Sequence, residues 1–170
     1  MKYLLFIVVL VAVVITAGCV GGNKETVVTS TPTPQIVYTT VLVTPTPTTS
    51  AGIDNFTEAH TLYSQSVDLA NGGNYEKALK TADDALALQV PQLVPVIQSN
   101  RAGILVMLGR NSEAITAADI ALSSKDNLTT VFSIAYFNKG NALKNLGRID
   151  EAKAAYAKAH ELDNSLVSPL

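Results

Sequence analysis

From residue 53 onward, apolar residues recur at spacings of three and four, which is the pattern of amphipathic helices. Three segments of this region align with one another without gaps: residues 72–88, 108–124 and 146–162. Their shared glycines are Gly73, Gly109 and Gly147. Glycine adopts the left-handed conformation that ends a helix more readily than other residues. The pattern therefore predicts a helical hairpin repeated three times, with a second helix starting shortly after each glycine.

Small residues recur at matching positions of the predicted second helices. These are Ala78, Ala114 and Ala152, and then Ala85, Ala121 and Ala159. Alanines seven apart lie on one face of a helix and let the two helices of a hairpin approach closely. Aliphatic residues are then expected to fill the space between hairpins: Leu79, Leu86, Ile115 and Leu122. The predicted fold class is all-α.

The third segment, AYFNKGNALKNLGRIDEAKAAYAKAHELDN at 135–164, resembles the tetratricopeptide repeat. The matching residues are Tyr136, Gly140, Leu143, Gly147, Ala152, Tyr156 and Ala159, while Asn164 stands where the repeat usually has its closing proline. The resemblance covers residues 53–165 in three copies, at about 58–92, 95–126 and 133–165. It implies three hairpins stacked as a short α-solenoid. The alternative is an unrelated six-helix bundle.

The resemblance implies a concave groove, lined by the first helix of each hairpin, that binds a peptide or a helix. Mapping the groove positions onto this chain gives His60, Tyr63, Val67 and Ala70, then Val96, Ser99, Gly103, Val106 and Met107, and finally Ile134, Phe137, Asn141 and Lys144. One known mode of the family clamps a C-terminal carboxylate with Lys, Arg and Asn. Asn100 is the only residue that matches that mode. The positions where the clamp has Lys or Arg hold Tyr63, Ile134 and Asn138 in this chain.

The groove is therefore expected to take an apolar peptide or helix, with backbone-directed contacts from Asn100 and Asn141. A second interpretation stays open. Tyr63, Val106 and Phe137 could pack against one another as core residues of a tightly curved array.

The N-terminus has the composition of a signal peptide. Residues 3–17 form an uncharged apolar stretch after Met1 and Lys2, shorter than the roughly 20 residues of a membrane span. Ala17, Gly18 and Cys19 resemble the end of a lipobox, in which the cysteine becomes the lipid-bearing N-terminus, although Thr16 stands where that motif usually has an aliphatic residue. Residues 1–18 are thus predicted to be a signal peptide, with lipidation at Cys19, or alternatively an uncleaved membrane anchor.

Residues 19–52 are rich in Thr, Pro and Val, and are predicted to form a disordered or polyproline-like linker. Within them, QIVYTTVLV at 35–43 has strong strand propensity, but no predicted sheet is present for it to join. Asn55 and Asn127 begin N-glycosylation sequons, which matter only if the domain is exported. Residues 166–170 are a short tail.

Composition excludes several functions. The net charge is −2, so there is no basic excess to neutralise the phosphates of a nucleic acid. The single cysteine excludes a disulfide framework, and His60 and His160 lack metal-ligand spacing. Asp83–Asp84 and Asp150–Glu151 are helical neighbours whose side chains point apart. No enzyme activity, metal or cofactor is therefore predicted.

The sequence favours a membrane-anchored, exported interaction module that binds a protein or peptide segment on the extracytoplasmic side. The alternatives are a structural envelope spacer or self-associating homo-oligomer without a specific client, and a domain that binds a small molecule between its repeats.

Overall fold

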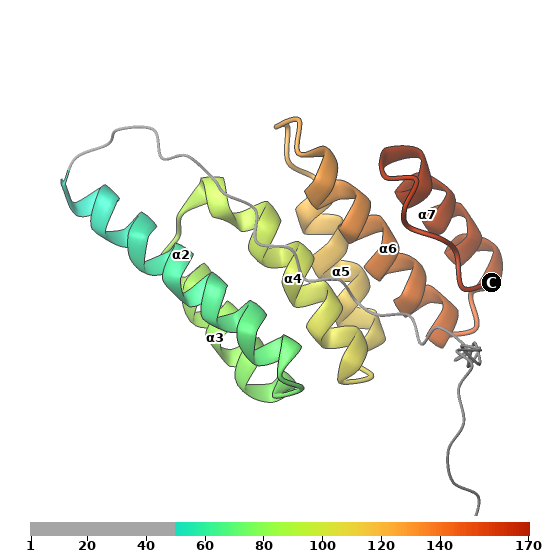
Figure 1. Cartoon of the computed structure of the whole chain (residues 1–170), viewed down its shortest axis with the longest axis horizontal. Helices are drawn as coiled ribbons and strands as arrows, with labels where there is room; N and C mark the ends of the chain where they lie inside the picture. The colour runs from blue at the N-terminus through green and yellow to red at the C-terminus, as the bar shows by residue number, and fades with distance from the viewer. Residues whose placement is uncertain (1–49) are drawn as a thin grey trace, which may run out of the picture. The chain divides into compact units, whose positions relative to one another are not determined.

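The computed structural model describes residues 50–170, and helices are the only regular secondary structure in this part of the chain (Figure 1). Its α-helices are α2 (Ser50–Asn71), α3 (Tyr75–Ala87), α4 (Val94–Met107), α5 (Asn111–Leu122), α6 (Thr129–Asn145) and α7 (Ile149–Leu162), and a 3-10 turn, η1, covers Pro91–Leu93. The predicted all-α fold is confirmed. The predicted signal segment, Cys19 and nearly all of the predicted linker lie outside the described residues.

Consecutive helices form three hairpins, α2–α3, α4–α5 and α6–α7. The predicted glycines are at the turns, with φ of 76° at Gly73, 72° at Gly109 and 76° at Gly147. At the first turn the Asn74 N–H reaches back to the Leu69 carbonyl at 2.8 Å, and a bond of the same type closes each of the other turns. A side chain in place of these glycines would strain the backbone, so the three glycines set where each second helix begins.

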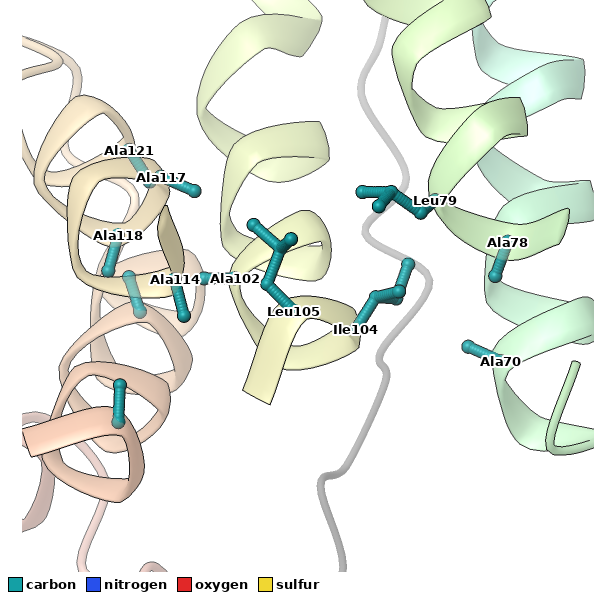
Figure 2. Packing of buried hydrophobic residues seen from close by; sticks show 12 residues of the cluster. Ala70, Ala78, Leu79, Ala102, Ile104, Leu105, Ala114, Ala117, Ala118 and Ala121 are labelled. Atoms are coloured by element: carbon teal, nitrogen blue, oxygen red, sulfur yellow. The ribbon is translucent and has the colours of Figure 1, made fainter. Parts of the chain in front are cut away.

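The hairpins pack through small residues. Ala102 on α4 and Ala114, Ala118 and Ala121 on α5 are fully buried, which brings these two helix backbones close together. Figure 2 shows Leu79 of α3 pointing toward α4, which carries Ile104 and Leu105. These larger side chains fill the space between the first two hairpins. α6 packs on both α5 and α4, whereas the first hairpin reaches the second mainly through α3 and α4.

The connections between hairpins add core of their own. Val90 and Leu93, from the segment that joins α3 to α4, are buried in a cluster with Tyr63 and Ile97. Leu128, just before α6, packs against the same cluster. The connections are longer than the nominal repeat allows, and their extra apolar residues cover the adjoining ends of the helices.

The last residues turn back onto the third hairpin. Asp163 Oδ1 accepts a hydrogen bond from the Ser165 N–H at 3.0 Å, and His160 Nδ1 lies 3.1 Å from the Leu166 carbonyl oxygen. Leu166 packs against the cluster that contains Phe137 and Tyr156. The tail therefore covers part of the apolar surface of the third hairpin.

Candidate functional site

The predicted groove residues lie on the first helices of the hairpins, α2, α4 and α6. We call the side of these helices that carries Tyr63, Val67, Asn100, Gly103, Val106, Met107, Ile134, Phe137 and Asn141 the first-helix face. Burial differs widely along it. Tyr63, Val67, Gly103 and Phe137 are buried, Val106 and Ile134 are half-buried, and Met107 is 46% exposed.

The structure distributes the apolar groove residues over three clusters. Tyr63 and Val67 belong to the cluster around Leu93, and Phe137 belongs to the cluster around Tyr156. Val106 packs at the edge of the central alanine-rich cluster. Tyr63, Val106 and Phe137 therefore support three different parts of the core and do not form one shared cluster.

A ladder of buried polar side chains connects the first helices. Asn100 Nδ2 on α4 donates to Ser66 Oγ on α2 at 3.1 Å, and Ser66 Oγ donates to the Ala78 carbonyl at 2.9 Å. Asn138 Nδ2 on α6 donates to the Ser99 carbonyl on α4 at 3.1 Å. These bonds fix the relative placement of helices that belong to different hairpins.

Asn141 has a different partner from the one expected. Its Oδ1 accepts a hydrogen bond from the Tyr156 hydroxyl on α7 at 2.8 Å, inside the third hairpin. Burial raises the pKa of the Tyr156 hydroxyl to about 12, because the surrounding apolar atoms disfavour the phenolate. One atom of the Asn141 side chain is thus already committed to the fold.

Four buried polar atoms in the described part of the chain lack a hydrogen-bond partner, and all four lie on first helices. They are His60 Nε2, Gln98 Oε1, Asn100 Oδ1 and Asn138 Oδ1. Asn100 is 5% exposed and Asn138 is 0% exposed. Sequence reasoning gave Asn138 no binding role. The available signal was its repeat position: Asn138 stands nine residues before Gly147, as Asn100 stands nine residues before Gly109.

The cations near the middle of α4 and α6 are already paired. Arg101 Nε lies 2.7 Å from Asp83 Oδ1 on α3, and Lys139 Nζ lies 2.6 Å from Asp119 Oδ1 on α5. Both pairs join a first helix to the second helix of the preceding hairpin. The centre of the first-helix face therefore holds buried acceptor oxygens and apolar groups, and its two central cations are engaged elsewhere.

Other charged groups form local pairs. Asp84 pairs with Lys80 at 2.6 Å, so the neighbours Asp83 and Asp84 serve different cations. At the hairpin turns, a hydrogen bond from Arg110 lowers the pKa of Glu113, and Arg148 does the same for Glu151. Among residues 50–170 no cluster of three or more His, Cys, Asp or Glu side chains is arranged to hold a metal ion. In the same residues, no helix combines the length and apolarity needed to cross a membrane.

The described domain is thus a helical repeat protein built from three hairpins. Residues 133–166 match the tetratricopeptide repeat family, one residue beyond the predicted third copy. The third hairpin therefore carries the tetratricopeptide repeat that the sequence indicated. Comparison with curated proteins found no significant match.

Two solved structures share the fold. The NMR structure of the first tetratricopeptide domain of the human RPAP3 protein is 23% identical with a TM-score of 0.56, and the match covers 63% of this chain and 80% of that one. The first tetratricopeptide repeat domain of Spaghetti (RPAP3), bound to the HSP90 peptide SRMEEVD, is 23% identical with a TM-score of 0.55. That match covers 64% of this chain and 81% of the other.

Proposed function

We propose that this protein is a membrane-anchored, exported adaptor whose first-helix face binds an uncharged segment of a partner protein. The fold supports binding of a protein segment, because a similar domain is bound to a peptide. The chemistry of the bound segment is proposed from this chain's own residues.

The observation that carries the proposal is the set of unpaired acceptors on the first helices. A buried polar atom without a partner costs about 1–3 kcal/mol. Gln98 Oε1, Asn100 Oδ1 and Asn138 Oδ1 lack partners, while the Nδ2 atoms of both asparagines are already used. Because these atoms are shielded from solvent, a bound segment recovers part of this cost where a side chain turns toward it and meets an N–H donor, as at Asn100, which is 5% exposed; this favours binding through the partner's backbone.

Charge then restricts the partner. The peptide SRMEEVD contains two glutamates and an aspartate. In this chain Arg101 and Lys139 are held in ion pairs with α3 and α5. A carboxylate brought to the centre of this face would meet acceptor oxygens beside cations that are already paired, so an acidic segment is disfavoured.

The test compares two fluorescent peptides of equal length, SRMEEVD and an uncharged peptide rich in Val, Thr and Tyr, by titration with the purified chain. We expect the uncharged peptide to bind at least about tenfold more tightly. Met107→Glu should weaken that binding. Ile120→Glu on α5 is the matched control, because Ile120 is 41% exposed and Met107 is 46% exposed. Equal binding of the two peptides, or equal effects of the two variants, would refute the proposed specificity.

Anchoring and export are proposed from the N-terminal sequence. The apolar stretch at 3–17 and the motif Ala17-Gly18-Cys19 support cleavage before Cys19 and lipid attachment to it. The intact mass of the mature protein from its host tests this directly. A mass that starts at Cys19 and includes lipid is expected, and glycans at Asn55 or Asn127 would confirm export. An unmodified chain that retains Met1 and dissolves without detergent would overturn this part of the proposal.

Self-association is the second candidate function. The observation that favours it is the exposure of Val167 and Leu170 near the last hairpin, at 73% and 50%. A concentration-dependent increase in sedimentation coefficient that Val167→Asp abolishes would support it. A monomer at all concentrations would exclude it.

A further inference from the structure

The two N-glycosylation sequons of the described domain lie in different structural settings. Residues 55–57, NFT, lie inside α2, whereas residues 127–129, NLT, run from the connection after α5 into the first residue of α6. Both asparagines are exposed, and an aspartate precedes each of them. Exposure and local sequence therefore do not distinguish the two sequons, but side-chain and backbone geometry does.

We propose that Asn127 is the glycosylation site of the folded domain and that Asn55 is not, so that the connection between α5 and α6 carries an N-linked glycan. In its host the modification rests on the export proposed above, because sequons serve as acceptors in exported chains. The choice between the two asparagines rests on the structure of the domain.

The side chains of the second sequon already face each other. The Thr129 hydroxyl donates a hydrogen bond to Asn127 Oδ1 at 3.2 Å. Side chains two residues apart on a helix do not face each other, so the Thr57 hydroxyl points away from the Asn55 amide. Only at Asn127 does the hydroxyl of the sequon lie beside the amide that would be modified.

This hydrogen bond suits the transfer of an oligosaccharide from a lipid phosphate. Asn127 Nδ2 forms a bond to the anomeric carbon of the sugar, and the bond from that carbon to the phosphate oxygen breaks. The lipid phosphate leaves with the electron pair, and one Nδ2 proton passes to a base of the transferase. As Nδ2 loses this proton, negative charge develops on Oδ1, where the Thr129 hydroxyl stabilises it.

The backbone of the second sequon is also easier to draw into an enzyme. The residues between Leu122 and Thr129 are not helical, and the first N–H groups of α6 have no partner inside that helix. Residues 55–57 are instead the sixth to eighth residues of α2, so their N–H groups bond to the preceding turn. α2 has to open before Asn55 can react.

The connection that carries Asn127 projects beyond the ends of the neighbouring helices (Figure 1). Leu128 packs against the core cluster around Leu93 and holds the connection in place, while Asn127 is exposed. α6 has 17 residues and is therefore about 25 Å long, with Asn127 at the end opposite its glycine turn. Met107 lies beside the glycine turn of the second hairpin, so a glycan on Asn127 leaves that part of the first-helix face open.

Glycosylation of the purified full-length chain in mild detergent tests the assignment. The folded chain is incubated with a single-subunit oligosaccharyltransferase and its lipid-linked oligosaccharide, and peptide mass spectrometry measures the occupancy of each asparagine. We expect Asn127 to be modified at least about tenfold faster than Asn55, because only Asn55 requires a helix to open. Asn127→Gln should remove the product, and the matched control Asn55→Gln should leave it unchanged.

Two peptides of equal length separate structure from local sequence. Residues 50–60, SAGIDNFTEAH, and residues 122–132, LSSKDNLTTVF, each carry the acceptor asparagine at the sixth position. We expect the difference in rate between them to be much smaller than in the folded chain. If the peptides show the same ratio as the folded chain, or if the folded chain is modified equally at both asparagines or at neither, the structural assignment is wrong.

Protein purified from its host separates this assignment from export. A glycan on Asn127 but not on Asn55 supports both. A glycan on Asn55 alone overturns the assignment and leaves export standing. If the host protein carries no glycan although the transferase modifies Asn127 in the purified chain, the assignment stands and the proposed export loses its support.

Discussion

Replacement of Gly140 by alanine tests whether packing or helix propensity controls the third hairpin. Gly140 lies on α6, and an added Cβ would lie 2.6 Å from Tyr156 Cε1 and 2.7 Å from Tyr156 Cδ1. The ring cannot move away freely. Tyr156 is 2% exposed, its hydroxyl is bonded to Asn141 Oδ1 at 2.8 Å, and its ring centroid lies 5.5 Å from that of Phe137.

The opposing contributions can be compared. Replacing a glycine inside a helix by alanine stabilises the helix by about 1 kcal/mol. Overpacking against the buried ring costs about 1–3 kcal/mol. Displacing the ring also weakens the Tyr156–Asn141 hydrogen bond, at about 0.5–1.5 kcal/mol. The sum predicts a net loss of about 1–3 kcal/mol, opposite in sign to the propensity effect alone.

Urea denaturation followed by helical circular dichroism measures this loss as a lower midpoint. With a slope of about 1–3 kcal/mol per molar urea, a loss of 2 kcal/mol shifts the midpoint by about 1 M. Gly72→Ala is the control, because its Cβ would meet the flexible Asn74 side chain at 3.3 Å and Gly72 has no positive φ. We expect it to change the free energy of unfolding by less than about 0.5 kcal/mol.

A second background identifies the cause. In Tyr156→Leu the ring is gone, so Gly140→Ala should become neutral or stabilising. If Gly140→Ala stabilises the wild type, or destabilises both backgrounds equally, then the close approach of Gly140 to Tyr156 does not control the packing of α6 on α7.

Three further predictions concern other contacts. A double-mutant cycle on Arg101 and Asp83 should give a coupling energy of about 0.5–1 kcal/mol, because Asp83 is half exposed. This coupling energy should fall as salt is added. A value above about 2 kcal/mol would contradict a surface ion pair. Burial raises the pKa of Tyr156 to about 12, so its contribution to the free energy of unfolding is complete below about pH 10 and is lost as the pH rises toward 12. Tyr156→Phe should remove this decline in stability. If the variant shows the same decline as the wild type, Tyr156 is not its cause. Leu166→Ala should lower the unfolding free energy by about 1 kcal/mol, while Val167→Ala, at a position 73% exposed, should have no effect; equal effects would mean that Leu166 does not cover the third hairpin.

The fold was largely predictable because the glycines and alanines report local requirements. A positive φ at Gly73 or Gly147 and close contact at Ala114 each depend on one residue and its immediate neighbours. The structure of the first-helix face depends also on how the hairpins pack against one another. Spacing shows that Tyr63 and Phe137 share a face, but the rotation of one hairpin relative to the next decides that they enter different clusters. Hydrogen-bond satisfaction is equally nonlocal, since Asn100 has its partner on α2, 34 residues away.

The ion pairs between hairpins bear on the choice between a binding domain and a self-stacking one. Arg101 and Lys139 each stand eight residues before a turn glycine, and Asp83 and Asp119 each stand ten residues after one. The same register holds Gln65 in the first hairpin and Ala157 in the third. A second copy stacked end to end in this register would place Gln65 beside Ala157, with no charge on either. The asparagine that bonds to the preceding hairpin would also be missing, because Ser64 stands in the first hairpin where Asn138 stands in the third. The contacts that join these three hairpins are therefore not reproduced between copies, which favours a segment bound across the first helices over extension of the array.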